Sequence, residues 1–231
     1  MPEFSLYGVA VFGGVFPALA WLWFWLQEDS KHPEPRRLIA LAFLGGMCTV
    51  VAVIPIEKLV ATFFLSTFAL FAAWSVIEEC AKYLSAKILI LWRPQNDEPI
   101  DPVMYMVTTA LGFAALENTL FLLSPLAGET MVQTILTGNL RFVGATLLHV
   151  FSSAVVGIAM AWAFYKPKRV KRVMTFLGVI LASLLHTVFN LLILSTAENH
   201  LLRTFAGVWI GVLVVLAALE FVKRIKPRFA R

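Results

Sequence analysis

Hydrophobic residues gather along this chain in long blocks, and short polar segments separate the blocks. Each block holds about 20 residues, which is the length a helix needs to cross the roughly 30 Å hydrocarbon core of a bilayer. The pattern predicts an all-α integral membrane protein, a polytopic bundle of about seven transmembrane helices. The predicted spans are residues 4–26, 38–56, 59–92, 103–123, 140–165, 173–194 and 204–222.

Composition supports this fold class. Of the 231 residues, 60% are hydrophobic and only 14% are charged, and the mean hydropathy is +0.82. A soluble domain carries about 25% charged residues, so a soluble protein is excluded. The apolar runs leave no room for a second domain, and residues 1–231 are predicted to form one membrane domain. The net charge of +5 comes from basic residues beside the apolar runs, so no nucleic-acid partner is expected.

The basic residues also predict the orientation in the membrane. With the amino terminus outside, fifteen of the 19 Lys and Arg residues lie in the loops and the tail on the inner side, and Lys58, Arg141 and Arg203 remain outside. Loops rich in Lys and Arg stay in the cytoplasm, so the carboxyl terminus is expected to be cytoplasmic and the location to be a bacterial plasma membrane.

The third span carries ionisable residues where none are expected. Glu78, Glu79 and Lys82 lie inside an apolar run, and each costs roughly 2.5–3.5 kcal/mol near a helix centre. Glu78 and Lys82 are four residues apart, so they share a helix face and can neutralise each other. As one helix, residues 59–92 would be about 51 Å long, so this span is expected to start later, tilt or break.

Three later spans contribute further polar residues. Glu117 lies in the fourth span, His149 in the fifth, and His186 and Asn190 in the sixth. Small residues precede and follow each histidine at helical spacing, and small residues let membrane helices approach closely. We therefore expect spans three to six to form a core of about residues 59–194. It would enclose one polar site made of Glu78, Glu79, Glu117, His149, His186 and Asn190.

This set of residues suits hydrolysis. A buried carboxylate can take a proton from water, and neighbouring polar groups can stabilise an oxyanion. Two histidines and a carboxylate, here Glu117, His149 and His186, also match the ligand count of a hydrolytic zinc site. The plainer interpretation is structural, with an ion pair between Glu78 and Lys82 and histidines that hydrogen-bond between helices.

The ordered motifs are similar to those of the PrsW family of intramembrane proteases, relatives of the CAAX prenyl proteases and of the APH subunit of γ-secretase. Glu78-Glu79-x-x-Lys82 resembles the EExxK motif and Phe113-x-x-x-Glu117 the FxxxE motif, and His149 and His186 resemble the two later histidines. CAAX proteases usually carry histidine in place of Glu117, which favours the PrsW branch. The resemblance implies a CAAX-protease-like core in spans three to six.

The resemblance implies an intramembrane endopeptidase that cleaves a membrane-anchored protein, such as a single-span anti-sigma factor. Glu78 or Glu79 would activate water, His149 and His186 would orient it or bind metal, and Asn190 would support the oxyanion. The resemblance is compatible with a zinc enzyme and with a metal-free glutamate enzyme. The alternatives are a proton-coupled transporter, which the lack of an inverted repeat disfavours, and a non-catalytic APH-like scaffold.

Overall fold

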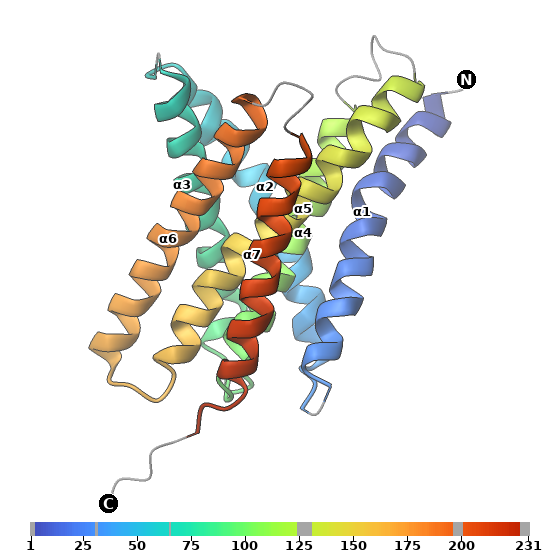
Figure 1. Ribbon diagram of the computed structural model, residues 1–231. Helices are drawn as coiled ribbons and strands as arrows, with labels where there is room; N and C mark the ends of the chain where they lie inside the picture. Colours follow the sequence, from blue (N-terminus) through green and yellow to red (C-terminus); the bar gives the residue numbers. More distant parts are fainter. Residues whose placement is uncertain (1–2, 31, 65, 124–130, 196–200, 227–231) are drawn as a thin grey trace, which may run out of the picture.

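The computed structural model describes residues 3–30, 32–64, 66–123, 131–195 and 201–226, which form helices without strands. In chain order the helices are α1 (Glu3–Glu28), α2 (Arg36–Ala61), α3 (Thr67–Ala86), α4 (Asp101–Leu123), α5 (Met131–Trp162), α6 (Lys168–Ser195) and α7 (Leu201–Val222). A π-helix, η1 (Lys87–Leu91), extends α3. The predicted all-α bundle is confirmed, and Figure 1 shows the helices running side by side along one axis.

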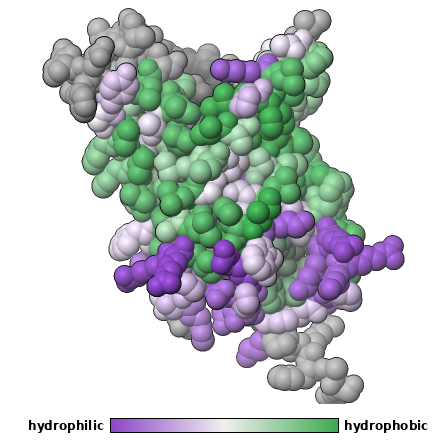
Figure 2. Space-filling model, turned by 180° about the vertical axis from the view of Figure 1, so that it is seen from behind, coloured by the Kyte–Doolittle hydropathy of each residue, from purple (hydrophilic) through white to green (hydrophobic). Residues whose placement is uncertain are grey.

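Five helices in the described ranges are long and apolar enough to cross a membrane, namely α1, α2, α4, α5 and α6. The longest apolar segment in the described part of α7 is shorter than the length needed to cross a membrane. Helix α3 is continuous, but its charged residues interrupt its apolar run. Hydrophilic residues gather at the end of the bundle where α1 ends and α6 begins, next to an apolar band (Figure 2). The chain is therefore a multi-pass membrane protein. The side chains of Arg141 and Arg203 lie outside the described set.

The predicted third span needs a correction. Residues 59–61 belong to α2, which ends at Ala61, and α3 begins only at Thr67. Its 20 residues measure about 30 Å, which matches the hydrocarbon core without a steep tilt. Hydropathy alone missed the turn because Phe63 and Phe64 are themselves apolar. Thr62 and Ser66 were the available signals, since short hydroxyl side chains favour turns and helix starts.

The remaining span boundaries shift by a few residues, and the α4 start and α5 end lie within three residues of their predicted positions. The larger difference is at the start of α5, where the helix begins at Met131 and not at residue 140. At the start of α6 the basic segment is helical from Lys168, because Lys and Arg are good helix formers.

Close helix crossings set the core around α4, which is buried along nearly its whole length. A methyl group on Gly46 would overlap the carbonyl oxygen of Thr109, and one on Gly112 would overlap that of Phe43. A methyl on Gly157 of α5 would come within 2.5 Å of the Cα of Val103. Glycine is therefore required for α4 to pack against both α2 and α5.

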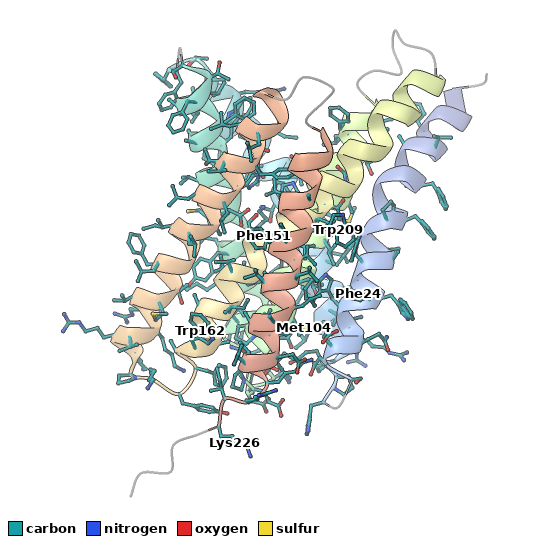
Figure 3. All side chains as sticks on the ribbon, viewed as in Figure 1. Phe24, Met104, Phe151, Trp162, Trp209 and Lys226 are labelled. Carbon is teal, nitrogen blue, oxygen red and sulfur yellow. The ribbon has the colours of Figure 1, made fainter. Side chains whose placement is uncertain are left out.

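The last helix covers α5 on the outside of this core. The ring of Phe151 lies against Gly211 of α7, and Trp209 of α7 packs on Trp21 of α1 with ring centroids 6.0 Å apart. Figure 3 shows the labelled Phe151 and Trp209 side chains beside α7. In Figure 1, α7 stands in front of α5, with α1 on one side and α3 and α6 on the other.

Candidate hydrolytic site

Four neighbouring helices, α3 to α6, bring the predicted site residues together. Glu78, Glu79, His149 and His186 are all buried, although each comes from a helix that also carries an apolar face. The rings of His149 and His186 meet edge to face, with centroids 5.0 Å apart. Residues separated by more than 100 positions in the chain therefore share one polar cluster inside the bundle.

Glu79 has both carboxylate oxygens engaged. Oε1 accepts hydrogen bonds from Nζ of Lys82 at 2.6 Å and from Nδ1 of His186 at 2.9 Å. Oε2 accepts one from the hydroxyl of Ser153 at 3.1 Å. A carboxylate satisfied in this way is held in place and has little capacity left to take a proton from water. Glu79 therefore positions other groups.

Glu78 has the opposite character. Its Oε2 atom is buried and has no hydrogen-bond partner among the residues that the structure describes. The atom lies 3.8 Å from each of Nδ1 of His149, Nε2 of His186 and Nζ of Lys82. The sequence paired Glu78 with Lys82, yet the shorter ion pair of that lysine is with Glu79. Glu78 thus offers a free oxygen at the centre of the cluster.

The hydrogen bonds also determine which nitrogen of each histidine carries hydrogen. Nε2 of His149 donates to Oε2 of Glu117 at 2.7 Å, and Nδ1 of His186 donates to Glu79. Carboxylates that neighbour cations are acceptors only, so the hydrogen belongs to the ring nitrogen in each pair. The remaining lone pairs are on Nδ1 of His149, which accepts a hydrogen bond from Nζ of Lys82 at 3.0 Å, and on Nε2 of His186, and both nitrogens lie 3.8 Å from Oε2 of Glu78.

Donor atoms of Glu78, His149 and His186 lie within 4.8 Å of one another, which is the spacing of a metal-ligand group. The set fits a divalent metal on two observations of the site. The Glu78 oxygen is otherwise without a partner, and each histidine is oriented by a carboxylate on its far nitrogen, as in carboxylate–histidine–metal sites. The predicted ligand set had Glu117 where the structure places Glu78. Glu117 lies instead on the far side of His149.

A pocket of about 200 Å³ leads to this cluster from within the bundle. Glu78, Glu117, His149, His186 and Asn190 line it together with Phe71, Trp74 and Phe189. The Glu117 side chain is 39% exposed there, whereas Lys82 is fully buried behind the imidazoles. Glu78 and both histidines therefore line one pocket that water can enter.

Two neighbours of the cluster were not in the predicted set. Ser153 lies one helical turn after His149, so the spacing of that row already marked it. Phe113, the first residue of the FxxxE motif, has its ring centroid 4.6 Å from Nζ of Lys82 and 5.1 Å from the His149 ring. Its contact with the ammonium group is a cation–π interaction, a role that spacing alone does not reveal.

Fold and site together define a multi-pass membrane hydrolase. The family described as PrsW family intramembrane metalloprotease matches residues 34–219, and the chain belongs to this family. It is accordingly an intramembrane protease. Protease PrsW of Geobacillus kaustophilus is 28% identical over 188 residues, which cover 79% of this chain and 78% of the relative. Protease PrsW of Bacillus subtilis is 22% identical over 205 residues, covering 85% of this chain and 88% of the relative. No solved structure matches the chain.

Proposed function

We propose that this protease cleaves a single-span membrane protein, for example an anti-sigma factor, in the pocket in front of Glu78. The observation that carries the proposal is Oε2 of Glu78, which has no hydrogen-bond partner in the described structure and lies 3.8 Å from Nδ1 of His149 and from Nε2 of His186, beside a pocket that both histidines line. A proton-coupled transporter would also use buried acids and histidines. Helices α3 to α6 gather these groups around one pocket, which favours hydrolysis.

Glu78 is the residue placed to receive a proton from the attacking water at Oε2, because Glu79 is already fully hydrogen-bonded. Nε2 of His186 orients that water through its lone pair, and Nδ1 of His149 can do so when Lys82 does not hydrogen-bond it. Asn190 lines the same pocket, and its amide is assigned to the developing oxyanion. Phe71, Trp74 and Phe189 restrict the access of bulk water, which strengthens each of these interactions.

We further propose zinc as the metal, held by Glu78, His149 and His186. Zinc prefers imidazole and carboxylate ligands and, when bound, lowers the pKa of a water in its open position. In that arrangement Glu78 is a ligand, and without metal it is the base. Its loss stops hydrolysis in either case.

The proposed orientation places the amino terminus outside and the tail in the cytoplasm of a bacterial plasma membrane. The basic segments at 166–172 and 223–226 support it, since they lie at the hydrophilic end of the bundle (Figure 2). Lys226 is labelled at this end in Figure 3. Membrane lipid and the substrate span are the proposed partners.

The experiment is co-expression with a tagged single-span anti-sigma factor, followed by detection of the shortened product. Wild-type protein should produce it, and Glu78→Gln and His149→Ala should not, although both variants reach the membrane. Cleavage retained in both variants would refute the assignment. Proton-driven solute uptake by reconstituted vesicles without peptide cleavage would favour the transporter, and assembly into a fixed complex that survives loss of Glu78 and Glu79 would favour the scaffold.

Elemental analysis of the purified protein tests the metal. Stoichiometric zinc is expected in the wild type, and it should be lost in His149→Ala, His186→Ala and Glu78→Ala. Glu117→Gln should keep most of the zinc, because Glu117 contacts the far nitrogen of His149 and no metal-facing atom. Loss of zinc in Glu117→Gln, with retention in Glu78→Ala, would instead favour the ligand set of Glu117, His149 and His186.

A further inference from the structure

Nζ of Lys82 contacts Nδ1 of His149, which is the nitrogen that a metal in the proposed site would bind. The side chain is fully buried, and Nζ lies 3.0 Å from Nδ1 of His149 and 3.8 Å from Oε2 of Glu78. A buried ammonium group with these neighbours stands beside two of the three donors assigned to the metal. The arrangement of Lys82 therefore bears directly on how the site takes up a cation.

A neutral imidazole has one lone pair available for either a hydrogen bond or a metal. The hydrogen of His149 is on Nε2, where it is donated to Glu117 at 2.7 Å, so Nδ1 carries the lone pair. Lys82 has only hydrogen atoms to offer and therefore donates one to Nδ1. A metal at Nδ1 and the ammonium of Lys82 at Nδ1 consequently exclude each other.

We infer that Lys82 is a built-in competitor of the metal for Nδ1 of His149, so that metal uptake requires Lys82 to release this nitrogen. The inference rests on the metal site in the proposed function. Lys82 can release His149 and still stay in the cluster. The ammonium group has three hydrogens, and the one that it donates to Glu79 at 2.6 Å is not the one that it donates to His149. The Phe113 ring, 4.6 Å from Nζ, gives the ammonium a second favourable neighbour on that side.

Two further observations support competition rather than a purely structural lysine. The other two donors are not blocked in the same way, since Oε2 of Glu78 has no hydrogen-bond partner within the described ranges and Nε2 of His186 faces that oxygen. Lys82 hydrogen-bonds the donor atom of His149 at 3.0 Å, whereas it lies 3.8 Å from that of Glu78, beyond hydrogen-bond distance. Lys82 thus acts as a positioning residue that holds the imidazole in the metal-free state and sets the metal affinity.

The test is a double-mutant cycle on zinc affinity, measured in purified metal-free protein by competition with a chromophoric chelator. Lys82→Met keeps the length and apolar stem of the side chain and removes the competing donor. It should lower the Kd for zinc at least tenfold. In a His149→Ala background zinc is lost on purification but can still be titrated at high concentration onto Glu78 and His186, and there the same change should alter the weaker Kd less than threefold, because the contested nitrogen is absent.

The cycle separates competition from plain charge repulsion. If Lys82→Met tightens zinc equally in both backgrounds, or not at all, the inference is overturned. Lys87→Met serves as the matched control, because it removes a positive charge from the next helical turn at an exposed position and should leave the Kd unchanged. Lys82→Arg keeps a cationic donor and should bind zinc no more tightly than the wild type.

A second measurement covers the case in which Lys82→Met does not fold. In wild-type protein labelled with ¹⁵N-lysine, zinc should shift the side-chain resonance of Lys82, and it should not do so in His149→Ala. A resonance that stays in place while zinc binds stoichiometrically overturns the inference.

Cleavage of the anti-sigma factor is assayed in parallel. If cleavage is absent but Lys82→Met still tightens zinc binding as expected, only the proposed substrate is refuted. If neither the wild type nor any variant binds zinc, the metal site and the competition are refuted together.

Discussion

Nδ1 of His186 donates a hydrogen bond to Oε1 of Glu79 at 2.9 Å, and this contact separates the roles of two adjacent glutamates. Because Glu79 is used to orient His186 and to neutralise Lys82, Glu78 is left with the unpartnered oxygen. Neighbouring side chains on a helix point about 100° apart, so one acid faces the supporting groups and the other faces the pocket. Distinct outcomes of mutation follow for the two residues.

Glu78→Gln is expected to reduce cleavage at least about 100-fold, since a general base contributes a factor of that order. Folding should be almost unaffected, because Oε2 makes no hydrogen bond in the described structure that the amide would lose. The measurement is the cleavage rate of the co-expressed anti-sigma factor together with the thermal unfolding midpoint in detergent. A variant that keeps its cleavage rate would contradict the role of Glu78.

Glu79→Gln is expected to destabilise the protein itself. The change removes the nearest charged partner of the Lys82 ammonium in the bundle interior and leaves Glu78 at 3.8 Å, and breaking a buried ion pair costs about 3–5 kcal/mol. A lower unfolding midpoint and a smaller folded fraction on size-exclusion chromatography should therefore accompany lost cleavage. Glu79→Gln with a wild-type midpoint would show that the 2.6 Å pair does not support the fold.

The glycines of the α2–α4 crossing predict a packing defect. Gly46→Leu and Gly112→Val place side-chain atoms against backbone of the facing helix, which cannot move aside as a flexible side chain can. Overpacking of a core costs of the order of 1–3 kcal/mol, so the yield of monodisperse protein should fall. Gly8→Leu is the matched control, because a Cβ at Gly8 meets no atom within 4 Å. Equal yields for the three variants would contradict the close crossing.

Glu34, in the loop between α1 and α2, predicts a pH dependence of stability. Burial raises the pKa of its carboxyl to about 8; a hydrogen bond with Asp101 and the negative charges of Asp101 and Asp29 add to this, while the hydrogen bond from Tyr105 opposes it. Between the ordinary value of 4.5 and about 8 the folded chain keeps a proton that the unfolded chain has lost. Stability should therefore fall as pH rises through this window.

Replacement of Glu34 by Gln removes that titration. Burial and the negative charges of Asp101 and Glu98 also raise the pKa of Asp29, to about 6. The titration of Asp29 therefore makes stability fall with rising pH as well, but at lower pH. Between about pH 6 and 8 the unfolding midpoint of the variant should consequently fall less steeply than that of the wild type. Midpoints measured across pH 5 to 9 test this, and identical slopes for both proteins would refute it.

Much of the fold could be predicted from hydropathy, because a helix that crosses a bilayer must be apolar over about 20 residues. The same rule failed between α2 and α3, where apolar Phe63 and Phe64 form part of the connection. Lipid-compatible residues are equally suited to a helix and to a short turn at its end. Only the backbone path placed the start of α3 at Thr67, and with it the depth of Glu78.

The sequence by itself determined which chemical groups enter the membrane, since Glu78, Glu79, Lys82, Glu117, His149 and His186 each stand out against an apolar run. It also indicated that small residues would bring these helices close together. The tertiary structure alone decided which groups hydrogen-bond: Lys82 with Glu79, His149 with Glu117, and Oε2 of Glu78 with none in the described chain. Pairing depends on the rotation of each helix about its axis, and that rotation is set by contacts such as Gly112 on Phe43 between segments far apart in the chain.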